Sequence, residues 1–282
     1  MSWELLTAIS VITTSVSVIL QRVLLHNDKS DPIAYAIVFQ GLTAIFFAIF
    51  ALFEGFKMPD FTKYWFPVTA TFVLYAIGNV IYAKTLQKVE ASIFSTLLAT
   101  STIWVVLMSY FLFAERPNSA QILGGLIIFG SVGILMERSG KLKLDTGIMM
   151  GLFMGLIFGL AKSAWIYVGK EAGVGVWNAL ACAVPALLLL LTNHRSVSKM
   201  KPLLTGRVFT KMLLLCILFA VCNLASLAAY QVGKVSVITP LMQTNVIITV
   251  ILAIIILGER KRLWQKVMAA VVCFIGVLLI IV

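Results

Sequence analysis

The sequence has little charge, and this shortage excludes most classes of soluble protein. Of its 282 residues, 12% are charged and 61% are hydrophobic. A water-soluble fold of this length needs a polar outer surface, and the polar sequence is too short to form one. Long apolar stretches instead predict transmembrane helices, and the length suits about ten spans of roughly 20 residues each. We therefore expect an all-α integral membrane protein without a separate soluble domain.

The side chains that usually carry catalysis or metal binding are also scarce. The two histidines, His26 and His194, fall in polar loops, and no glycine-rich phosphate loop precedes a soluble helix. No metal-ligand spacing relates the four cysteines, which lie inside apolar stretches and have the usual character of small buried hydrophobes; they are Cys182, Cys216, Cys222 and Cys273. We predict no catalytic residue, no metal site and no cofactor, and therefore no enzyme.

Acidic residues number 11, and none of them lies deep in an apolar stretch. A buried carboxylate that relays protons or pairs with a cationic substrate is therefore not expected. The net charge of +11 would suggest nucleic acid in a soluble protein. Here most basic residues lie at span ends, where they meet lipid headgroups, so nucleic acid is not an expected partner.

The apolar stretches divide the chain into ten predicted spans. In chain order they cover residues 3–25, 33–53, 64–87, 91–113, 119–136, 146–168, 174–192, 208–231, 235–257 and 263–282. The short charged linker 137–145 joins the first five spans to the last five, so we expect two packed lobes.

The second half of the chain repeats the first. Residues 79–135, shifted by 144, align without a gap on 223–279. Polar matches in this register include Asn79 with Asn223, Thr100 with Thr244, and Glu115 with Glu259. We assign repeats to residues 1–138 and 145–282. Because each repeat has five spans, an odd number, the two are inverted with respect to each other and related by a pseudo-two-fold axis in the membrane plane.

These features together resemble the drug/metabolite transporter superfamily, in its ten-helix EamA-type branch. The segments FAERPNSAQILGGLIIFGSVGIL and LGERKRLWQKVMAAVVCFIGVLL are similar to that family's recurring "GE-R" segment and the helix that follows it. The first repeat departs from this pattern, because Ala114 stands where the second repeat has Gly258. The resemblance covers the whole chain and implies a transporter, but it does not specify the substrate.

Lys162 is the most unusual residue within a span. It precedes Lys170 by eight residues, which places it about 12 Å inside the span end. Charged residues at such depth usually face a bundle interior or a wet cavity, so Lys162 is a candidate contact for an anion or a substrate carboxylate; snorkelling is the alternative. Trp165 nearby is a candidate aromatic wall, or lipid-facing bulk. For Lys84, one turn from Lys88, snorkelling is the favoured interpretation.

Polar stripes mark four further spans, and together they favour a central polar cavity, although for each residue taken alone interhelical packing is the favoured interpretation. The candidates for substrate binding are Asn79, Tyr82, Thr100, Asn223, Tyr230, Gln243 and Thr244, together with Lys162 and Trp165. Pro240 is expected to kink its helix at mid-span, where the asymmetry with Thr96 suggests a substrate contact. Span 1 adds Thr13, Thr14, Ser17 and Gln21, and glycines at every fourth position from Gly147 to Gly159 predict close helix packing.

Basic residues divide unequally between the two sides of the membrane. We call the side reached by segments after odd-numbered spans the odd face, and the other the even face. With Lys84 and Lys162 set aside, the odd face holds 15 of the other 20 lysines and arginines. The positive-inside rule would make the odd face cytoplasmic, with both termini outside, whereas the family resemblance implies cytoplasmic termini. Reporter fusions at Val282 distinguish the two.

The leading hypothesis is a secondary transporter that exports small organic metabolites such as amino acids. Alternating access would move two five-helix lobes around a central polar cavity. Lys162 without buried acids favours anionic or zwitterionic substrates. A lipid-linked carrier or flippase is the main alternative, and a membrane-embedded enzyme is a further one that the lack of clustered acids argues against. The expected partners are the lipid bilayer, a small metabolite and a coupling ion; monomer and homodimer both stay open. The expected location is the cytoplasmic membrane of a prokaryote.

Overall fold

Apolar helices dominate the fold because a bilayer offers backbone polar groups no water to bond, so each span must satisfy its own hydrogen bonds. The computed structural model describes residues 2–25, 31–114, 118–138, 141–142, 145–259 and 261–281. Within these residues, nine helical segments are long and apolar enough to cross a membrane, and a shorter apolar core lies at Ile122–Ile134. The prediction of an all-α, ten-span membrane protein is confirmed.

The helices follow the predicted spans closely, and α9 differs most, since it begins at Gly206 rather than Val208. The helices are α1 (Trp3–Leu25), α2 (Pro32–Glu54), α3 (Trp65–Lys88), α4 (Ala91–Ala99), α5 (Ser101–Phe113), α6 (Ser119–Met136), α7 (Thr146–Gly169), α8 (Val174–Thr192), α9 (Gly206–Val232), α10 (Val235–Met242), α11 (Asn245–Ile256) and α12 (Leu263–Ile281). Two 3-10 helices, η1 (His194–Lys199) and η2 (Lys201–Leu204), connect α8 to α9, and the linker between the repeats contains a two-residue pairing of β1 (Glu137–Arg138) with β2 (Lys141–Leu142).

Spans 4 and 9 are each broken near their middle, at positions that the repeat makes equivalent. The break lies at Thr100 between α4 and α5, and at Gln243–Thr244 between α10 and α11. Both threonine hydroxyls donate to the carbonyl three residues earlier, Thr100 to Leu97 at 2.7 Å and Thr244 to Leu241 at 2.8 Å. Pro240 therefore does not explain the breaks alone, because the first repeat breaks without a proline.

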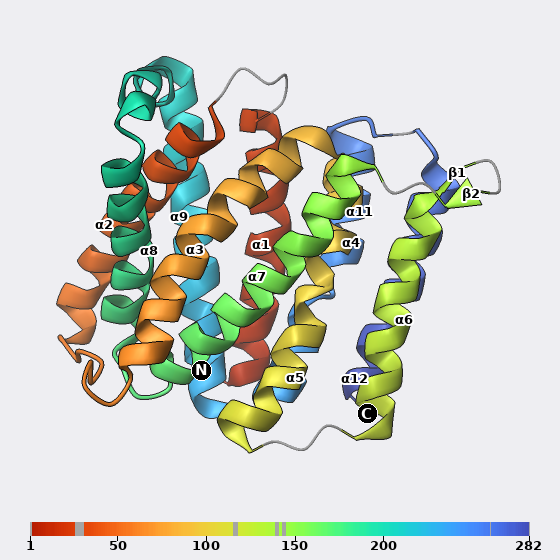
Figure 1. Cartoon of the computed structure of the whole chain (residues 1–282), viewed down its shortest axis with the longest axis horizontal. Helices are drawn as coiled ribbons and strands as arrows, with labels where there is room; N and C mark the ends of the chain where they lie inside the picture. Colours follow the sequence, from red (N-terminus) through yellow and green to blue (C-terminus); the bar gives the residue numbers. More distant parts are fainter. Residues whose placement is uncertain are drawn as a thin grey trace.

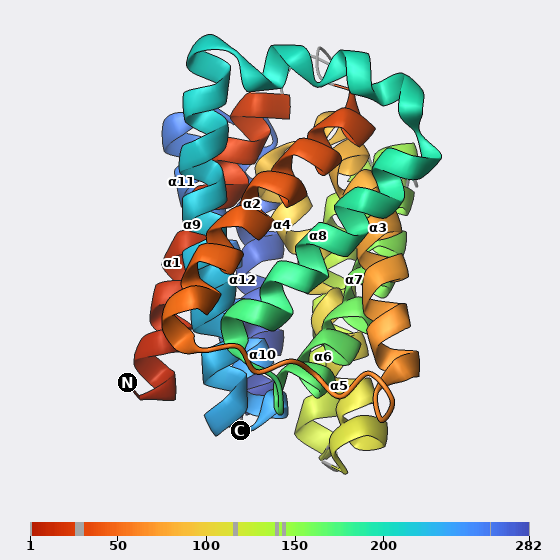
Figure 2. The same cartoon turned by 90° about the vertical axis from the view of Figure 1, so that its left-hand side faces the viewer.

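Helix contacts obey the exchange of the two repeats. The packing of α1 on α9 corresponds to that of α7 on α3, and the packing of α1 on α11 corresponds to that of α7 on α5. The pairs α2–α8 and α6–α12 each join a helix to its own repeat equivalent. Both chain ends lie at the same end of the bundle (Figure 2). This pattern is what two inverted five-helix repeats predict.

The two halves of the sequence are not separate lobes, and that expectation is wrong. Their helices interleave into two bundles, one of α1, α9 and α10–α11, the other of α7, α3 and α4–α5. We call these the α1 bundle and the α7 bundle. The α2–α8 pair flanks them on one side and the α6–α12 pair on the other (Figure 1). The physical reason is that α1 and α3 make their most extensive contacts with helices of the opposite repeat, α9 and α7.

The glycine stripe of α7 provides the close packing of the α7 bundle. A Cβ atom added at Gly155 would lie 2.1 Å from the Thr100 hydroxyl, and one at Gly159 would lie 2.8 Å from the Ser101 carbonyl. The glycine stripe therefore packs directly against the α4–α5 break. This agrees with the prediction that the stripe serves close helix packing.

Candidate functional site

A cavity of about 180 Å³ lies at the centre of the bundle, between the α1 and α7 bundles and the α2–α8 pair. None of the described lining residues comes from α6 or α12. A cavity of this volume suits a small solute. The principal lining residues are Ser10, Thr14, Ser17, Val18, Gln21, Gln40, Tyr75, Asn79, Tyr82, Leu98, Ser101, Phe158, Lys162, Trp165, Asn178, Phe219, Cys222, Asn223, Ser226, Met242, Gln243 and Asn245.

The predicted substrate-binding residues divide into a group that lines this cavity and a group that lies behind its wall. The lining group is Lys162, Asn79, Tyr82, Asn223, Gln243 and Trp165. Thr100 and Thr244 use their hydroxyls at the helix breaks. Tyr230 is fully buried, and its hydroxyl bonds Thr239 at 3.0 Å. Pro240 is buried within α10, one turn before the break. Which of these residues contacts a substrate stays a prediction.

Lys162 is the only residue with a formal charge among the described lining residues. It lies in α7, seven residues before Gly169, at a depth of about 10 Å. Its Nζ atom lies 5.5 Å from the centre of the Tyr230 ring, within the range of a cation–π contact. No ion pair joins it to a residue in the described part of the chain. Lys84, by contrast, is exposed on the outer face of α3, as snorkelling predicts.

Trp165 and Tyr230 form an aromatic surface next to Lys162. Their rings meet edge to face with centroids 6.3 Å apart, and the Trp165 carbonyl accepts a hydrogen bond of 2.8 Å from the Trp177 indole. Both aromatic side chains are almost completely buried, which excludes the lipid-facing alternative for Trp165. Lys162 is thus held against a rigid aromatic wall, and the cation remains on the cavity side.

Asn79 and Asn223, equivalent in the repeat, have equivalent local geometry. The Asn79 amide donates to the Tyr75 carbonyl at 2.8 Å, and the Asn223 amide donates to the Phe219 carbonyl at 2.9 Å. Each amide therefore keeps its oxygen and one N–H group for a ligand. The cavity has a matched pair of polar groups on opposite bundles.

Sequence reasoning missed the contributions of α2 and α8, which are Gln40 and Asn178. The Gln40 side-chain oxygen and the Ser17 hydroxyl are buried and have no hydrogen-bond partner among the described residues. Leaving such groups unpaired costs about 1–3 kcal/mol each, so a ligand or solvent that bonds them is strongly favoured. Gln40 and Asn178 could have been found in the sequence, because each is a lone amide side chain in an otherwise apolar span.

Part of the polar stripe on α9 serves packing instead. The Ser226 hydroxyl bonds that of Ser10 at 2.7 Å, and Thr14 contacts the Cys222 sulfur at 2.8 Å. These bonds connect α1 to α9 at the edge of the cavity. On the opposite bundle, the Phe158 ring meets those of Tyr75 and Tyr82, with centroids 6.0 and 5.8 Å away, so this wall is aromatic.

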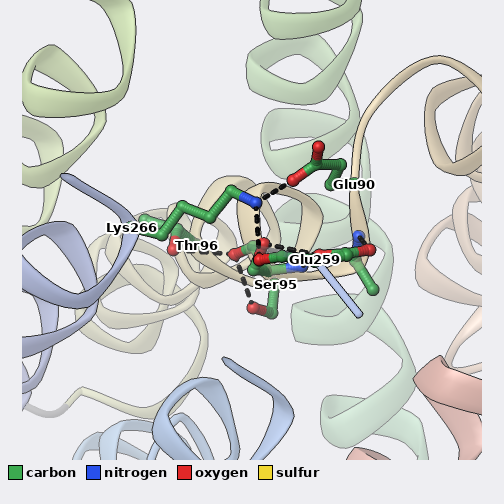
Figure 3. Close-up of polar contacts among 7 residues, drawn as sticks. Glu90, Ser95, Thr96, Glu259 and Lys266 are labelled. Atoms are coloured by element: carbon green, nitrogen blue, oxygen red, sulfur yellow. Dashed lines mark hydrogen bonds and ion pairs between the residues drawn. The ribbon is translucent and has the colours of Figure 1, made fainter. Parts of the chain in front are cut away.

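A second polar cluster lies at the odd face, at the start of α4 (Figure 3). Glu259, which follows α11, accepts hydrogen bonds from the Ala91 nitrogen at 2.7 Å, the Ser92 nitrogen at 3.1 Å and the Ser92 hydroxyl at 2.7 Å. Lys266 pairs with Glu90 and donates to the Glu259 carbonyl at 3.2 Å. The glutamate of the second "GE-R" segment is therefore an N-terminal cap supplied by the opposite repeat. Its equivalent, Glu115, lies outside the described residues, as does Arg116.

Comparison with known proteins gives a family and a fold. The sequence pattern of the EamA-like transporter family matches residues 1–136 and 144–282. A solved structure described as "Crystal structure of protein" is similar to this chain, with a TM-score of 0.71 and 14% identity, over 98% of this chain and 94% of that one. At that identity the likeness shows the fold alone. No curated protein matches the chain.

Proposed function

The chain belongs to the EamA-like transporter family, and from this membership we propose that it is a secondary transporter of small anionic or zwitterionic organic metabolites. As a multi-pass membrane protein of a transporter family, it has the lipid bilayer as its surroundings and a small molecule as its substrate. Membership also supports transport rather than catalysis.

The observation that carries the proposal is the single charge of the cavity. Lys162 carries a formal positive charge within α7, about 10 Å from the helix end, and no carboxylate lies among the described lining residues. Burying an ammonium group without a counter-ion is costly, and a substrate carboxylate offsets that cost. A cationic substrate would instead be repelled by Lys162.

The remaining lining groups suit the rest of such a substrate. Amide oxygens of Gln40, Asn79 and Asn223 can accept from an amino or hydroxyl group, and the rings of Phe158 and Tyr75 can cover an apolar part. Amino acids and related metabolites combine these groups at a size compatible with the cavity. The small volume does not favour the lipid-linked carrier.

For the mechanism we propose alternating access, in which the cavity opens to one side of the membrane at a time. The repeats 1–138 and 145–282 would both contribute helices to each moving body, because they interleave. The α1 and α7 bundles would move as the two bodies, and the breaks at Thr100 and Gln243 would allow the halves of spans 4 and 9 to tilt separately. Export across the cytoplasmic membrane of a prokaryote is the proposed direction and location, on the basis of the family resemblance. A coupling ion is part of this proposal.

The test is uptake by proteoliposomes with a panel of amino acids, amines and sugar phosphates. Lys162→Gln should raise KM for carboxylates about 10- to 100-fold, the equivalent of the ~1.5–3 kcal/mol of a charged hydrogen bond. The matched control is Lys84→Gln, which removes an intramembrane lysine outside the cavity and should leave KM unchanged. Equal kinetics for wild type and Lys162→Gln would remove Lys162 from the site, and uptake restricted to amines would reject the proposed substrate class.

A further inference from the structure

The connection between α8 and α9 carries basic residues that no acidic residue of the same stretch balances. Residues 172–258 contain no Asp or Glu, yet they contain six basic residues. Five of these fall between positions 195 and 211: Arg195, Lys199, Lys201, Arg207 and Lys211. We call residues 195–211 the basic segment.

The 3-10 helices of the basic segment lie across the end of the helix bundle on the odd face, and α9 then continues along the bundle (Figure 2). Helices η1 and η2 pack on α2, and Ser196 and Leu203 on their inner side are buried. All five basic side chains are exposed, and so are the apolar side chains of Val197, Leu204 and Val208. Cations beside exposed apolar groups are typical of elements that lie in the membrane interface.

Only one of the five cations has an acidic partner in the part of the chain that the structure describes. The Lys199 Nζ atom lies 2.8 Å from an Asp31 carboxylate oxygen. Burial raises the pKa of Asp31, but hydrogen bonds from Lys199 and from the Ala34 and Ile33 nitrogens outweigh it, so the pKa lies below its usual value. Arg195, Lys201, Arg207 and Lys211 form no ion pair there, and their charges remain available to a partner.

The equivalent connection in the first repeat has no such excess. Between α2 and α3, on the even face, Lys57 and Lys63 are accompanied by Asp60, and Lys63 pairs with Glu171 at 3.0 Å. The basic segment is therefore a property of one face of the protein and not of the fold as such.

We propose that the basic segment binds the anionic headgroups of phospholipids. The phosphodiester oxygens would accept hydrogen bonds from the guanidinium and ammonium groups, and Val197, Leu204 and Val208 would enter the boundary with the acyl chains. Each basic residue near an anionic membrane surface contributes about a fivefold factor in affinity. The bilayer is the committed source of the phosphate, because the exposed apolar side chains have no role in binding a free ion.

Native mass spectrometry of the full chain in detergent, titrated with phosphatidylglycerol or phosphatidylcholine, tests the proposal. The wild type should retain phosphatidylglycerol in preference, and the variant Arg195→Gln/Lys201→Gln/Arg207→Gln/Lys211→Gln should lose that preference. The matched control neutralises four lysines of the even face, Lys57→Gln/Lys63→Gln/Lys170→Gln/Lys234→Gln, and should keep it. Equal retention by the basic-segment variant would overturn the proposal.

Two further measurements cover the case in which the quadruple variant does not fold. Arg195→Gln and Arg207→Gln as single variants should each lower phosphatidylglycerol affinity about fivefold. Unchanged affinity in both would reject the basic segment as the binding surface. Inorganic phosphate should not displace the lipid at equal concentration; if it does, the site binds free anions and the lipid assignment is wrong.

Discussion

The two walls of the cavity have the same positions but different chemistry. Helices α1, α3 and α4–α5 contribute lining residues whose repeat equivalents on α7, α9 and α10–α11 also line the cavity. The pairs, related by a shift of 144, are Thr14 with Phe158, Val18 with Lys162, Gln21 with Trp165, Tyr75 with Phe219, Asn79 with Asn223, Tyr82 with Ser226, Leu98 with Met242, and Ser101 with Asn245. Within these pairs, only the asparagines are identical.

This difference separates the requirements of movement from those of recognition. Two inverted repeats can exchange conformations only if their backbones and contacts are equivalent, and here the packing of α1 on α9 matches that of α7 on α3. A substrate has no such symmetry, so its contacts differ on the two walls. The largest difference is charge, with Lys162 on α7 and Val18 at the equivalent position of α1.

Moving the charge between the two walls should have the largest effect. Lys162→Val should lower kcat/KM for carboxylates about 10- to 100-fold in a proteoliposome uptake assay. Adding Val18→Lys should recover part of the loss, because position 18 faces the same cavity. If kcat/KM of the double variant does not exceed that of Lys162→Val, a lysine on the α1 wall cannot replace Lys162 in binding the substrate carboxylate.

Packing of the α7 bundle depends on glycine, whereas α1 has Val11 at the position equivalent to Gly155. Gly155→Ala should lower the free energy of unfolding by about 1–3 kcal/mol, because the new Cβ would meet the Thr100 hydroxyl. Thermal unfolding followed by tryptophan fluorescence in detergent measures this. Gly130→Ala, where no described atom lies within 4 Å of an added Cβ, is the control and should be neutral or stabilising.

Two carboxylates cap helices of the opposite repeat, and their burial differs. Glu259, 8% exposed, caps α4 with three hydrogen bonds, whereas Glu54 is exposed and caps α8 through the Val174 and Gly175 nitrogens. Glu259→Gln should cost about 1–2 kcal/mol of unfolding free energy, and Glu54→Gln less than about 1 kcal/mol. The same thermal assay ranks the two. A larger loss of unfolding free energy in Glu54→Gln than in Glu259→Gln would contradict the explanation that burial strengthens the cap.

The smallest expected effect concerns the residue that ends span 4 or span 9. Ala114 (φ 55°) and Gly258 (φ 66°) both adopt the left-handed conformation, which costs a residue with a Cβ atom about 1 kcal/mol. Ala114→Gly should therefore raise the unfolding temperature slightly, and Gly258→Ala should lower it. Opposite shifts of similar size are expected, since an added Cβ at Gly258 meets no described atom within 4 Å.

Much of the fold follows from the sequence because bilayer geometry leaves few alternatives. Helix ends such as Trp3, Leu25, Ala91 and Thr192 coincide with the predicted span limits. The left-handed backbone conformations were harder to predict. Position 114 is an alanine, and only a glycine at that position would have indicated a positive φ. The prediction at Pro240 was incomplete for a similar reason, because a threonine hydroxyl that bonds the backbone leaves no clear pattern in an apolar span.

The sequence by itself determined the membrane class, the number of spans, the inverted repeats and Lys162 as an unusual charge within a span, since hydropathy and register are local properties of the chain. Only the tertiary structure decided that the repeats interleave, that Gln40 and Asn178 join Lys162 at one cavity, and that Glu259 caps α4. These features depend on which apolar faces meet. In a chain with 61% hydrophobic residues, many faces are suitable for packing, and small side chains such as Gly155 select among them by how closely two helices can approach.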